Sequence, residues 1–156
     1  MKRIALAATL LFMTLISWAQ TAGQDIYRKY SEEKKVSSVY ISPSMFSIIK
    51  SLPGMDASEV AGIRSLTGFY TIEIENKAVA AKLANDVRSL VEKGSYELVM
   101  EAVDEDDKTY IYCQRENGVI RSIILLSEEP DETDFICIEG EMREEMLRSM
   151  MSEARD

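Results

Sequence analysis

The sequence predicts an α+β fold: a single domain in which helices pack on one face of a largely antiparallel sheet. Three observations lead to this prediction. The second half of the chain holds four short segments that alternate apolar and polar residues, as strands with one buried face do. Stretches in the first half place apolar residues three and four positions apart, as amphipathic helices do. The chain has 156 residues, which suits one hydrophobic core better than two.

The first 19 residues have the pattern of a secretory signal peptide. Lys2 and Arg3 precede an uncharged apolar run over residues 4–16, and small residues then precede a cut between Ala19 and Gln20. The apolar run is shorter than the about 20 residues that a membrane-spanning helix needs, so we prefer a signal peptide to a membrane anchor. We therefore expect a periplasmic protein with no stable membrane insertion after signal cleavage.

The mature chain is divided into two parts at the sequence level. Residues 20–35 are predicted to be a polar segment or a short helix, which Ile26, Tyr27 and Tyr30 dock onto the rest of the protein. Residues 36–156 are predicted to form the single α+β domain.

The domain begins with a strand over residues 36–42, because "VSSVYIS" alternates and is rich in β-branched and aromatic residues. Ser42 then caps a helix whose first residue is Pro43, where a missing N–H has no cost. Pro53 and Gly54 end this helix. Its predicted apolar stripe is Met45, Ile48, Ile49 and Leu52.

A second short helix is predicted to begin at Asp56, because Asp56 and Glu59 have the spacing of a capping box. Gly68 ends it, and a half-buried strand follows over residues 69–75, where apolar and polar residues alternate. The apolar side of this helix is predicted to hold Val60, Ile63 and Leu66.

The clearest helix follows Asn76, a residue type that caps helix amino termini, and Gly94 ends it. Charged residues occupy one face of this helix. The other face is apolar and is predicted to pack on the sheet through Val79, Leu83, Val87, Leu90 and Val91.

A four-strand meander is predicted next. An acidic turn over residues 104–107 makes the first connection, and Asn117 with Gly118 makes a tight hairpin, since both residues tolerate positive φ. A closing helix over residues 141–153 carries methionines four apart, a spacing that favours core packing over a Cu(I) site: Met142, Met146 and Met150. The four predicted strands cover residues 96–103, 109–114, 119–126 and 134–140.

Cys113 and Cys137 are predicted to be two reduced, largely buried thiols. A two-residue hairpin turn pairs Cys113 with Ser122, and a seven-residue loop pairs Cys137 with Ile123, which places the thiols two strands apart and on opposite faces. A disulfide requires Cα atoms within about 7 Å of each other. A bridge remains the alternative, because export favours paired cysteines and consecutive strands are not always neighbours.

Composition excludes several classes of function. The formal net charge is −9 and becomes −11 after the signal peptide, with its two basic residues, is removed. This charge argues against nucleic acid as a partner. The chain has no histidine, which excludes Ser-His and Cys-His nucleophile pairs and histidine metal sites. No glycine-rich phosphate-binding motif is present, so no cofactor is expected.

Carboxylates are predicted to gather at one end of the sheet, because the 104–107 turn and the loop over residues 128–134 are separated by one outward and one returning strand. This acidic end could hold Ca²⁺ or bind a basic partner, although the spacing does not match an EF-hand and acidic turns are often simply solvated. The predicted binding residues are Asp104, Asp106, Asp107, Glu128, Glu129, Asp131 and Asp134.

A hydrolase is an alternative, because Ser-x-x-Lys occurs at Ser31 with Lys34 and at Ser47 with Lys50. The spacing puts serine and lysine on one helical face, where a desolvated lysine can accept the serine proton. The accompanying motifs of penicillin-binding enzymes are missing, and chance matches explain such short motifs well.

The chain resembles a family of exported Bacteroidetes proteins grouped as domain of unknown function 4252. The resemblance rests on the signal peptide and on the segments "VSSVYISPSMF", "YELVMEAVDEDDKTYIYC", "GVIRSIILLSE" and "DFICIEGEM". It implies a small α+β domain in a Gram-negative envelope, with no established activity and no site residues. Some relatives look lipid-anchored, whereas this chain lacks a cysteine at the cut.

Together these features predict a non-enzymatic interaction module that binds a protein partner in the periplasm or cell envelope. A small hydrolase using Ser/Lys or carboxylates and a calcium-dependent binding module are the alternatives. The oligomeric state is not assigned.

Overall fold

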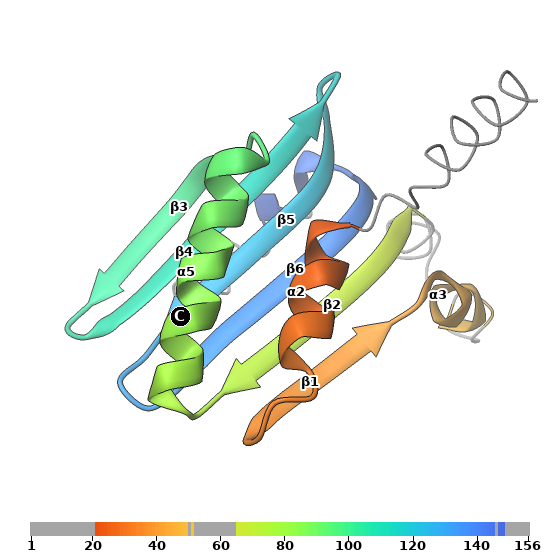
Figure 1. The fold of residues 1–156 in the computed structure, drawn as a ribbon. Helices are drawn as coiled ribbons and strands as arrows, with labels where there is room; N and C mark the ends of the chain where they lie inside the picture. The colour runs from red at the N-terminus through yellow and green to blue at the C-terminus, as the bar shows by residue number, and fades with distance from the viewer. Residues whose placement is uncertain (1–20, 50, 52–64, 146, 149–156) are drawn as a thin grey trace, which may run out of the picture.

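The structure is a computed structural model that describes residues 21–49, 51, 65–145 and 147–148. The predicted signal peptide therefore lies outside the described residues. Six antiparallel strands form one open sheet in the order β1-β2-β6-β5-β4-β3, which confirms the α+β class and the predicted meander (Figure 1). The strands are Val36–Ile41 (β1), Leu66–Ile74 (β2), Glu97–Asp104 (β3), Asp107–Glu116 (β4), Val119–Glu128 (β5) and Thr133–Met142 (β6).

Three helices accompany the sheet in the described part of the chain: α2 (Ala22–Tyr30), α3 (Pro43–Ile49) and α5 (Lys77–Lys93). Helices α2 and α5 lie next to each other on one face of the sheet, and α3 lies at the margin, beyond the end of β1 (Figure 1). The segment predicted to be polar or a short helix is thus the helix α2.

The long helix α5 forms as the sequence predicts. The Asn76 side chain accepts hydrogen bonds from the N–H groups of Ala78 and Val79 at 3.0 and 3.2 Å, which satisfies donors that have no partner inside the helix. The Gly94 N–H donates to the Leu90 carbonyl at the other end. The buried residues of the helix are Ala80, Leu83, Ala84 and Val87.

The core between the helices and the sheet is apolar and continuous. Helix α2 contributes Ile26 and Tyr30, both buried. Gly23 lets α2 approach the sheet closely, because a Cβ atom at this position would lie 2.7 Å from Cys137 Sγ. The sheet contributes Tyr70, Ile72, Ile74, Tyr112, Ile124, Leu126, Phe135 and Cys137.

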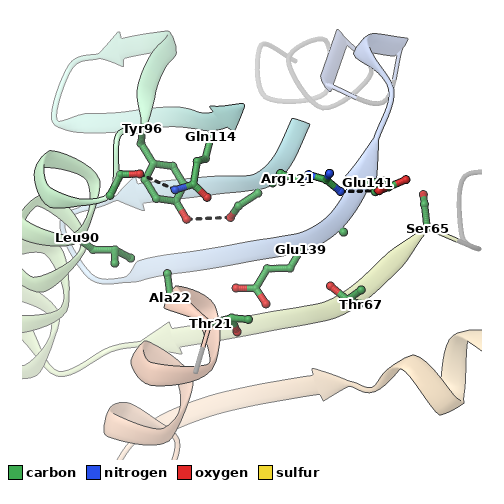
Figure 2. A pocket seen from close by; sticks show the side chains of 13 residues that line it. Thr21, Ala22, Ser65, Thr67, Leu90, Tyr96, Gln114, Arg121, Glu139 and Glu141 are labelled. Carbon is green, nitrogen blue, oxygen red and sulfur yellow. Dashed lines mark hydrogen bonds and ion pairs between the residues drawn. The ribbon is translucent and has the colours of Figure 1, made fainter. Parts of the chain in front are cut away.

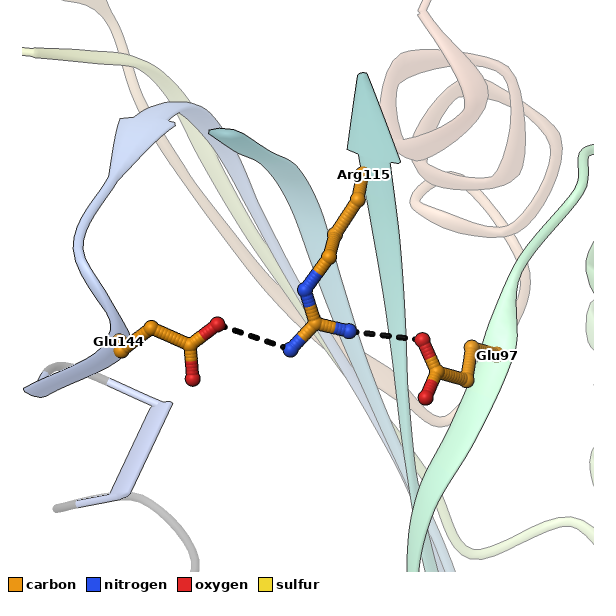
Figure 3. Close-up of polar contacts among 3 residues, drawn as sticks. All are labelled: Glu97, Arg115 and Glu144. Carbon is orange, nitrogen blue, oxygen red and sulfur yellow. Dashed lines mark hydrogen bonds and ion pairs between the residues drawn. The ribbon is translucent and has the colours of Figure 1, made fainter. Parts of the chain in front are cut away.

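The opposite face of the sheet carries a second apolar cluster. Its buried members are Ile111, Cys113, Ile120, Ile123, Ile138, Met142 and Leu147. The segment after β6 is held beside this cluster by an arginine, because Arg115 donates to Glu97 of β3 at 2.7 Å and to Glu144 at 3.0 Å (Figure 3). Arg115 therefore links β3, β4 and the chain that follows β6.

Two predictions for the first half of the domain are wrong. The predicted stripe of α3 is largely exposed, and Phe46 is the buried residue, because this short helix lies at the sheet margin and touches it on one side only. The second predicted helix cannot extend to Leu66, because β2 begins there and continues through Gly68. The remainder of that predicted helix, and Leu52 of the α3 stripe, lie outside the described residues.

Both predicted strand registers are wrong by one residue. An irregularity between Gln114 and Arg115 shifts the hairpin, so that Cys113 pairs with Ile123. The loop between β5 and β6 is shorter than predicted, and Cys137 pairs with Ile124. Both cysteines pair with a residue of β5 one position later than predicted, so the two thiols still lie on opposite faces of the sheet. Both cysteines are free and buried, which confirms the prediction of reduced thiols.

The end of β6 also differs from the prediction. The closing helix was predicted from residue 141, but Met142 belongs to β6 and pairs with Ile120. The strand continues because Glu141 N–H donates to the Ser65 carbonyl at 2.9 Å, where the edge of β2 begins. Met146 and Met150 lie outside the residues whose side chains are described.

Candidate functional site

The two acidic segments of the predicted site lie at the same end of the sheet. Strand β4 begins at Asp107, β5 ends at Glu128, and Lys108 pairs with Glu128 across these two strands. The β3–β4 turn and the β5–β6 loop therefore lie at the same end of the sheet, at the lower left of Figure 1. All of the seven predicted binding residues are described.

These seven residues do not form one group. Asp104, Asp106 and Asp107 are exposed around the β3–β4 turn. In the β5–β6 loop, Glu128 forms an ion pair with Arg88, and Asp131 forms a longer, exposed one with Lys77 at 3.8 Å. Both cations belong to α5. Helix α5 therefore neutralises part of the negative charge that was predicted to bind a partner. Glu129, in the same loop, is exposed.

A tighter carboxylate group lies beside the loop. Glu73, Glu132 and Asp134 place carboxylate oxygens within 4.8 Å of one another. Burial, together with the like charges of Glu132 and Glu73, raises the pKa of Asp134 to about 6. Glu73 is not among the residues predicted from the sequence, although it is the cross-strand neighbour of Asp134. The pairing of β2 with β6, which no local pattern reveals, brings them together.

Among the described residues, the Ser-x-x-Lys pairs supply no buried lysine. Lys34 is exposed, and Ser31 follows the last residue of α2. The Ser47 hydroxyl donates to the Pro43 carbonyl of its own helix at 3.2 Å, and Lys50 lies outside the described residues. This arrangement offers no desolvated base at Ser31.

A cavity of about 720 Å³ lies between the start of α2, the end of α5 and the sheet (Figure 2). Its size falls in the range of small-molecule sites. Glu139 of β6 lines it and is 94% buried, leaving 6% exposed. The other lining residues are Thr21, Ala22, Ser65, Thr67, Leu90, Gly94, Tyr96, Gln114, Arg121, Ser122, Gly140 and Glu141.

Glu139 holds the first turn of α2 against the sheet. Its Oε1 accepts a hydrogen bond from the Gly23 N–H at 3.0 Å, and the Cys137 Sγ lies 3.9 Å from the same oxygen. Burial raises the pKa of Glu139, and hydrogen bonds from Thr21 and Gly23 only oppose that rise. The carboxyl group is thus surrounded by neutral donors and sits at the positive end of a helix.

The rest of the polar wall is linked by hydrogen bonds. The Tyr96 hydroxyl donates to Ser122 Oγ at 3.0 Å, and that oxygen lies 3.7 Å from Cys137 Sγ. The Gln114 amide donates to the Gly94 carbonyl. Burial raises the pKa of Tyr96 to about 12 and also raises the pKa of Cys137, so both groups stay protonated at neutral pH.

Arg121 stands at the rim of the cavity. It donates to Glu141 at 2.6 Å, and its Nε lies 3.4 Å from Glu116 Oε2 without hydrogen-bond geometry. The Arg121 guanidinium group therefore forms ion pairs with Glu141 and Glu116 and not with Glu139.

The cavity is not among the sites predicted from the sequence, although the sequence contains one signal of it. Phe135, Cys137 and Glu139 alternate along β6, so that Glu139 occupies a position on the apolar, helix-covered face. A carboxylate at such a position is costly unless it is hydrogen-bonded, and it is therefore informative. The walls come from segments far apart in the chain, and only the fold brings them together.

The comparisons with known proteins give one result. The family model for a domain of unknown function (DUF4252) matches residues 30–150. The chain belongs to this family. No curated protein and no solved structure matches the chain. The DUF4252 match includes the acidic end and Glu139 but begins at Tyr30, so the part of α2 that lines the cavity precedes it.

In this DUF4252 member, no helix among the described residues is long and apolar enough to cross a membrane. In the described part of the chain, the fold brings together the polar residues of both the cavity and the acidic end.

Proposed function

We propose that the protein is an exported, non-enzymatic module of the periplasm or cell envelope that binds a protein partner at the free edge of β1. The observation that supports this proposal is the difference between the two edges of the sheet. An edge strand exposes unpaired N–H and C=O groups, and charged residues usually protect it from other strands.

The two edges differ in charge. Strand β3 carries Glu97, Glu101 and Asp104, which discourage strand addition. Strand β1, with the sequence "VSSVYI", carries no charged residue, no proline and no glycine, and it pairs with β2 without an irregularity. β1 is thus the unprotected edge (Figure 1).

Exposed apolar side chains accompany this edge. Among the described residues, six large apolar side chains are strongly exposed, and four of them lie on β1 and α3: Val39, Tyr40, Met45 and Ile48. The Tyr40 ring stacks on Tyr70 with centroids 5.0 Å apart, so its position is fixed before a partner arrives. Pre-positioned tyrosines are frequent energetic centres of interfaces.

The partner that suits this margin is a protein with an extended, uncharged segment. Such a segment can add to the sheet as a seventh strand through main-chain hydrogen bonds, while its alternate side chains contact Val39 on one face and Tyr40 on the other. The exposed residues of α3 extend the apolar surface beyond the end of β1.

The test uses one substitution at each edge. Val39→Lys charges the β1 edge, and Val103→Lys charges the β3 edge at a residue of similar exposure, 59% against 51%. Cross-linked capture from the envelope of the host should yield a stoichiometric partner with the wild type and with Val103→Lys. Val39→Lys should reduce capture at least tenfold. Equal capture by both variants contradicts binding at β1.

Two controls complete this test. Mass spectrometry of the mature protein from the envelope fraction should find Gln20, open or cyclised, as the first residue, and an intact leader in the cytoplasm contradicts export. Light scattering of the purified protein should show a monomer. A concentration-dependent dimer that Val39→Lys abolishes would identify a second copy as the occupant and contradict the envelope partner.

Calcium-dependent binding is the second candidate, favoured by the three carboxylates Glu73, Glu132 and Asp134. Oxygen ligands at this spacing suit Ca²⁺. Millimolar Ca²⁺ should raise the melting temperature of the wild type and leave that of Asp134→Asn unchanged. The absence of a shift in the wild type contradicts this candidate.

A further inference from the structure

The cavity beside α2 contains a carboxylate that the described residues leave without a cation. Glu139 is almost fully buried, and its hydrogen-bond donors are the Gly23 backbone and neutral side chains. Among the described residues, no lysine or arginine forms an ion pair with it. Neutral donors offset only part of the cost of burying a charge.

The nearby charges do not supply this cation. Arg121 is held by Glu141 and Glu116 at the rim, and Asp25 of α2 adds a further negative charge near the carboxyl group. The cavity is therefore negative overall, since its lining has one arginine and two glutamates. A negative cavity of about 720 Å³ favours a cationic occupant over an anionic one.

The walls indicate what kind of cation fits. The helix amino terminus repels positive charge, so a cation must approach Glu139 from the side of the cavity. On that side lies the hydroxyl group of Thr67, beside that of Thr21, which also accepts from the Gln24 N–H, and an ammonium group has three N–H donors to share among such oxygens. Leu90 and Ala22 add apolar surface, which suits an aliphatic body.

We infer that the cavity binds a primary ammonium group, which pairs with the Glu139 carboxylate while its aliphatic body contacts Leu90 and Ala22. This chemistry has two sources. One is a free aliphatic amine. The other is the amino group that signal cleavage creates at Gln20, because Gln20 is bonded to Thr21 and Thr21 lines the cavity. The second source rests on the export proposed above.

The experiment compares two forms of the chain from residue 20 onward, which contains every described residue of the fold. One form has a free amino group and the other an acetylated one. Both carry Gln20→Ala, so that slow cyclisation of an amino-terminal glutamine during purification and storage does not remove the amino group under test. Each form is made with Glu139 and with Glu139→Gln, and melting temperatures and n-butylamine binding are measured.

If the chain's own ammonium is the occupant, acetylation lowers the melting temperature of the Glu139 protein by several degrees and leaves that of Glu139→Gln unchanged. The pKa of the free amino group also lies above its ordinary value of about 8. The acetylated form then binds n-butylamine, and the free form does not.

If a separate amine is the occupant, both forms bind n-butylamine with a Kd in the millimolar range, about the limit for so small a ligand. Glu139→Gln weakens this binding at least tenfold. If neither acetylation nor n-butylamine has an effect that depends on Glu139, the inference is overturned.

Two further variants keep the result clear if Glu139→Gln folds poorly. Thr67→Trp fills part of the cavity, keeps Glu139 in the sequence, and should abolish n-butylamine binding to the acetylated form. Glu141→Gln removes one negative charge at the rim, as Glu139→Gln does inside the cavity, and should preserve n-butylamine binding. A different cleavage site in the host would contradict the Gln20 amino group as the occupant, and an intact leader would contradict the export proposal; n-butylamine binding by the acetylated protein tests the cavity in either case.

Discussion

Two carboxyl groups on β6, those of Asp134 and Glu139, have a pKa that burial raises more than any other cause does, but the neighbours of the two groups differ. Asp134, near the start of β6, is partly buried and faces the carboxylates of Glu132 and Glu73. Glu139, five positions along, is buried among neutral donors beneath α2. Repulsion between partly exposed charges is screened by salt, whereas the cost of burial is not.

Because of this difference, substitutions of the two carboxyl groups should have different effects. Glu139 anchors a helix and faces a cavity, so a change there alters the packing of α2. Asp134 lies in a group whose charges oppose one another, so removing one of them relieves the others. Substitutions at and around the two carboxyl groups test this contrast.

Gly23→Ala should have the largest effect, because the new Cβ would lie 2.7 Å from Cys137 Sγ and 3.0 Å from Glu139 Oε1. Overpacking of this kind typically costs about 1–3 kcal/mol. Urea denaturation should show the free energy of unfolding reduced by this amount. Gln24→Ala, one position along the same helix, should change it by less than about 0.5 kcal/mol. Equal effects of the two substitutions would show that α2 does not pack closely on Glu139.

Asp134→Asn should stabilise the protein at neutral pH. A carboxyl group whose folded pKa is raised to about 6 stabilises the fold below the pKa of the unfolded chain, and this contribution is lost as the pH rises through 6. The amide of the variant does not deprotonate, so the variant keeps this stabilisation as the pH rises. We expect a gain of roughly 1 kcal/mol at pH 7.5, after allowing for solvent screening, and no gain near pH 3.

Salt sharpens this prediction. The fraction of the gain that comes from Glu73 and Glu132 should shrink in 0.5 M NaCl, because these charges are near solvent. Denaturation curves at several pH values and two salt concentrations measure it. A gain that persists unchanged at pH 3 would mean that the repulsion of charged carboxylates is not its cause.

Lys77→Ala should have the smallest effect. Lys77 and Asp131 are both strongly exposed and their charged atoms are 3.8 Å apart. Such ion pairs contribute little, and we expect a change below about 0.5 kcal/mol in the free energy of unfolding. A loss above 1 kcal/mol would show that the helix α5 organises the β5–β6 loop more strongly than the geometry indicates.

Much of the fold could be predicted because its elements are local. The cap at Asn76 and the repeat of apolar residues specify α5, and the pair Asn117 and Gly118 specifies a hairpin, with φ values of 52° and 80°. The registers could not be predicted. The irregularity between Gln114 and Arg115 inserts a residue without a sequence signature, and this shifts every pair beyond it.

The acidic end and the cavity also differ in how far the sequence could predict them. The acidic end could be predicted because the residues follow one another in two short segments. The cavity could not, since Thr21, Leu90 and Glu139 are distant in sequence and meet only through the packing of α2 and α5. Even at the acidic end, the pairing of Arg88 with Glu128 depends on where α5 crosses the sheet.

The placement of the two thiols has a consequence for how the chain folds. Cys113 and Cys137 lie on opposite faces of the sheet, with β5 between their strands, so the folded protein cannot join them. An unfolded chain in an oxidising compartment has no such barrier, and a bridge formed there would prevent β4, β5 and β6 from assembling. Rapid closure of the meander would therefore protect an exported chain from a covalent error.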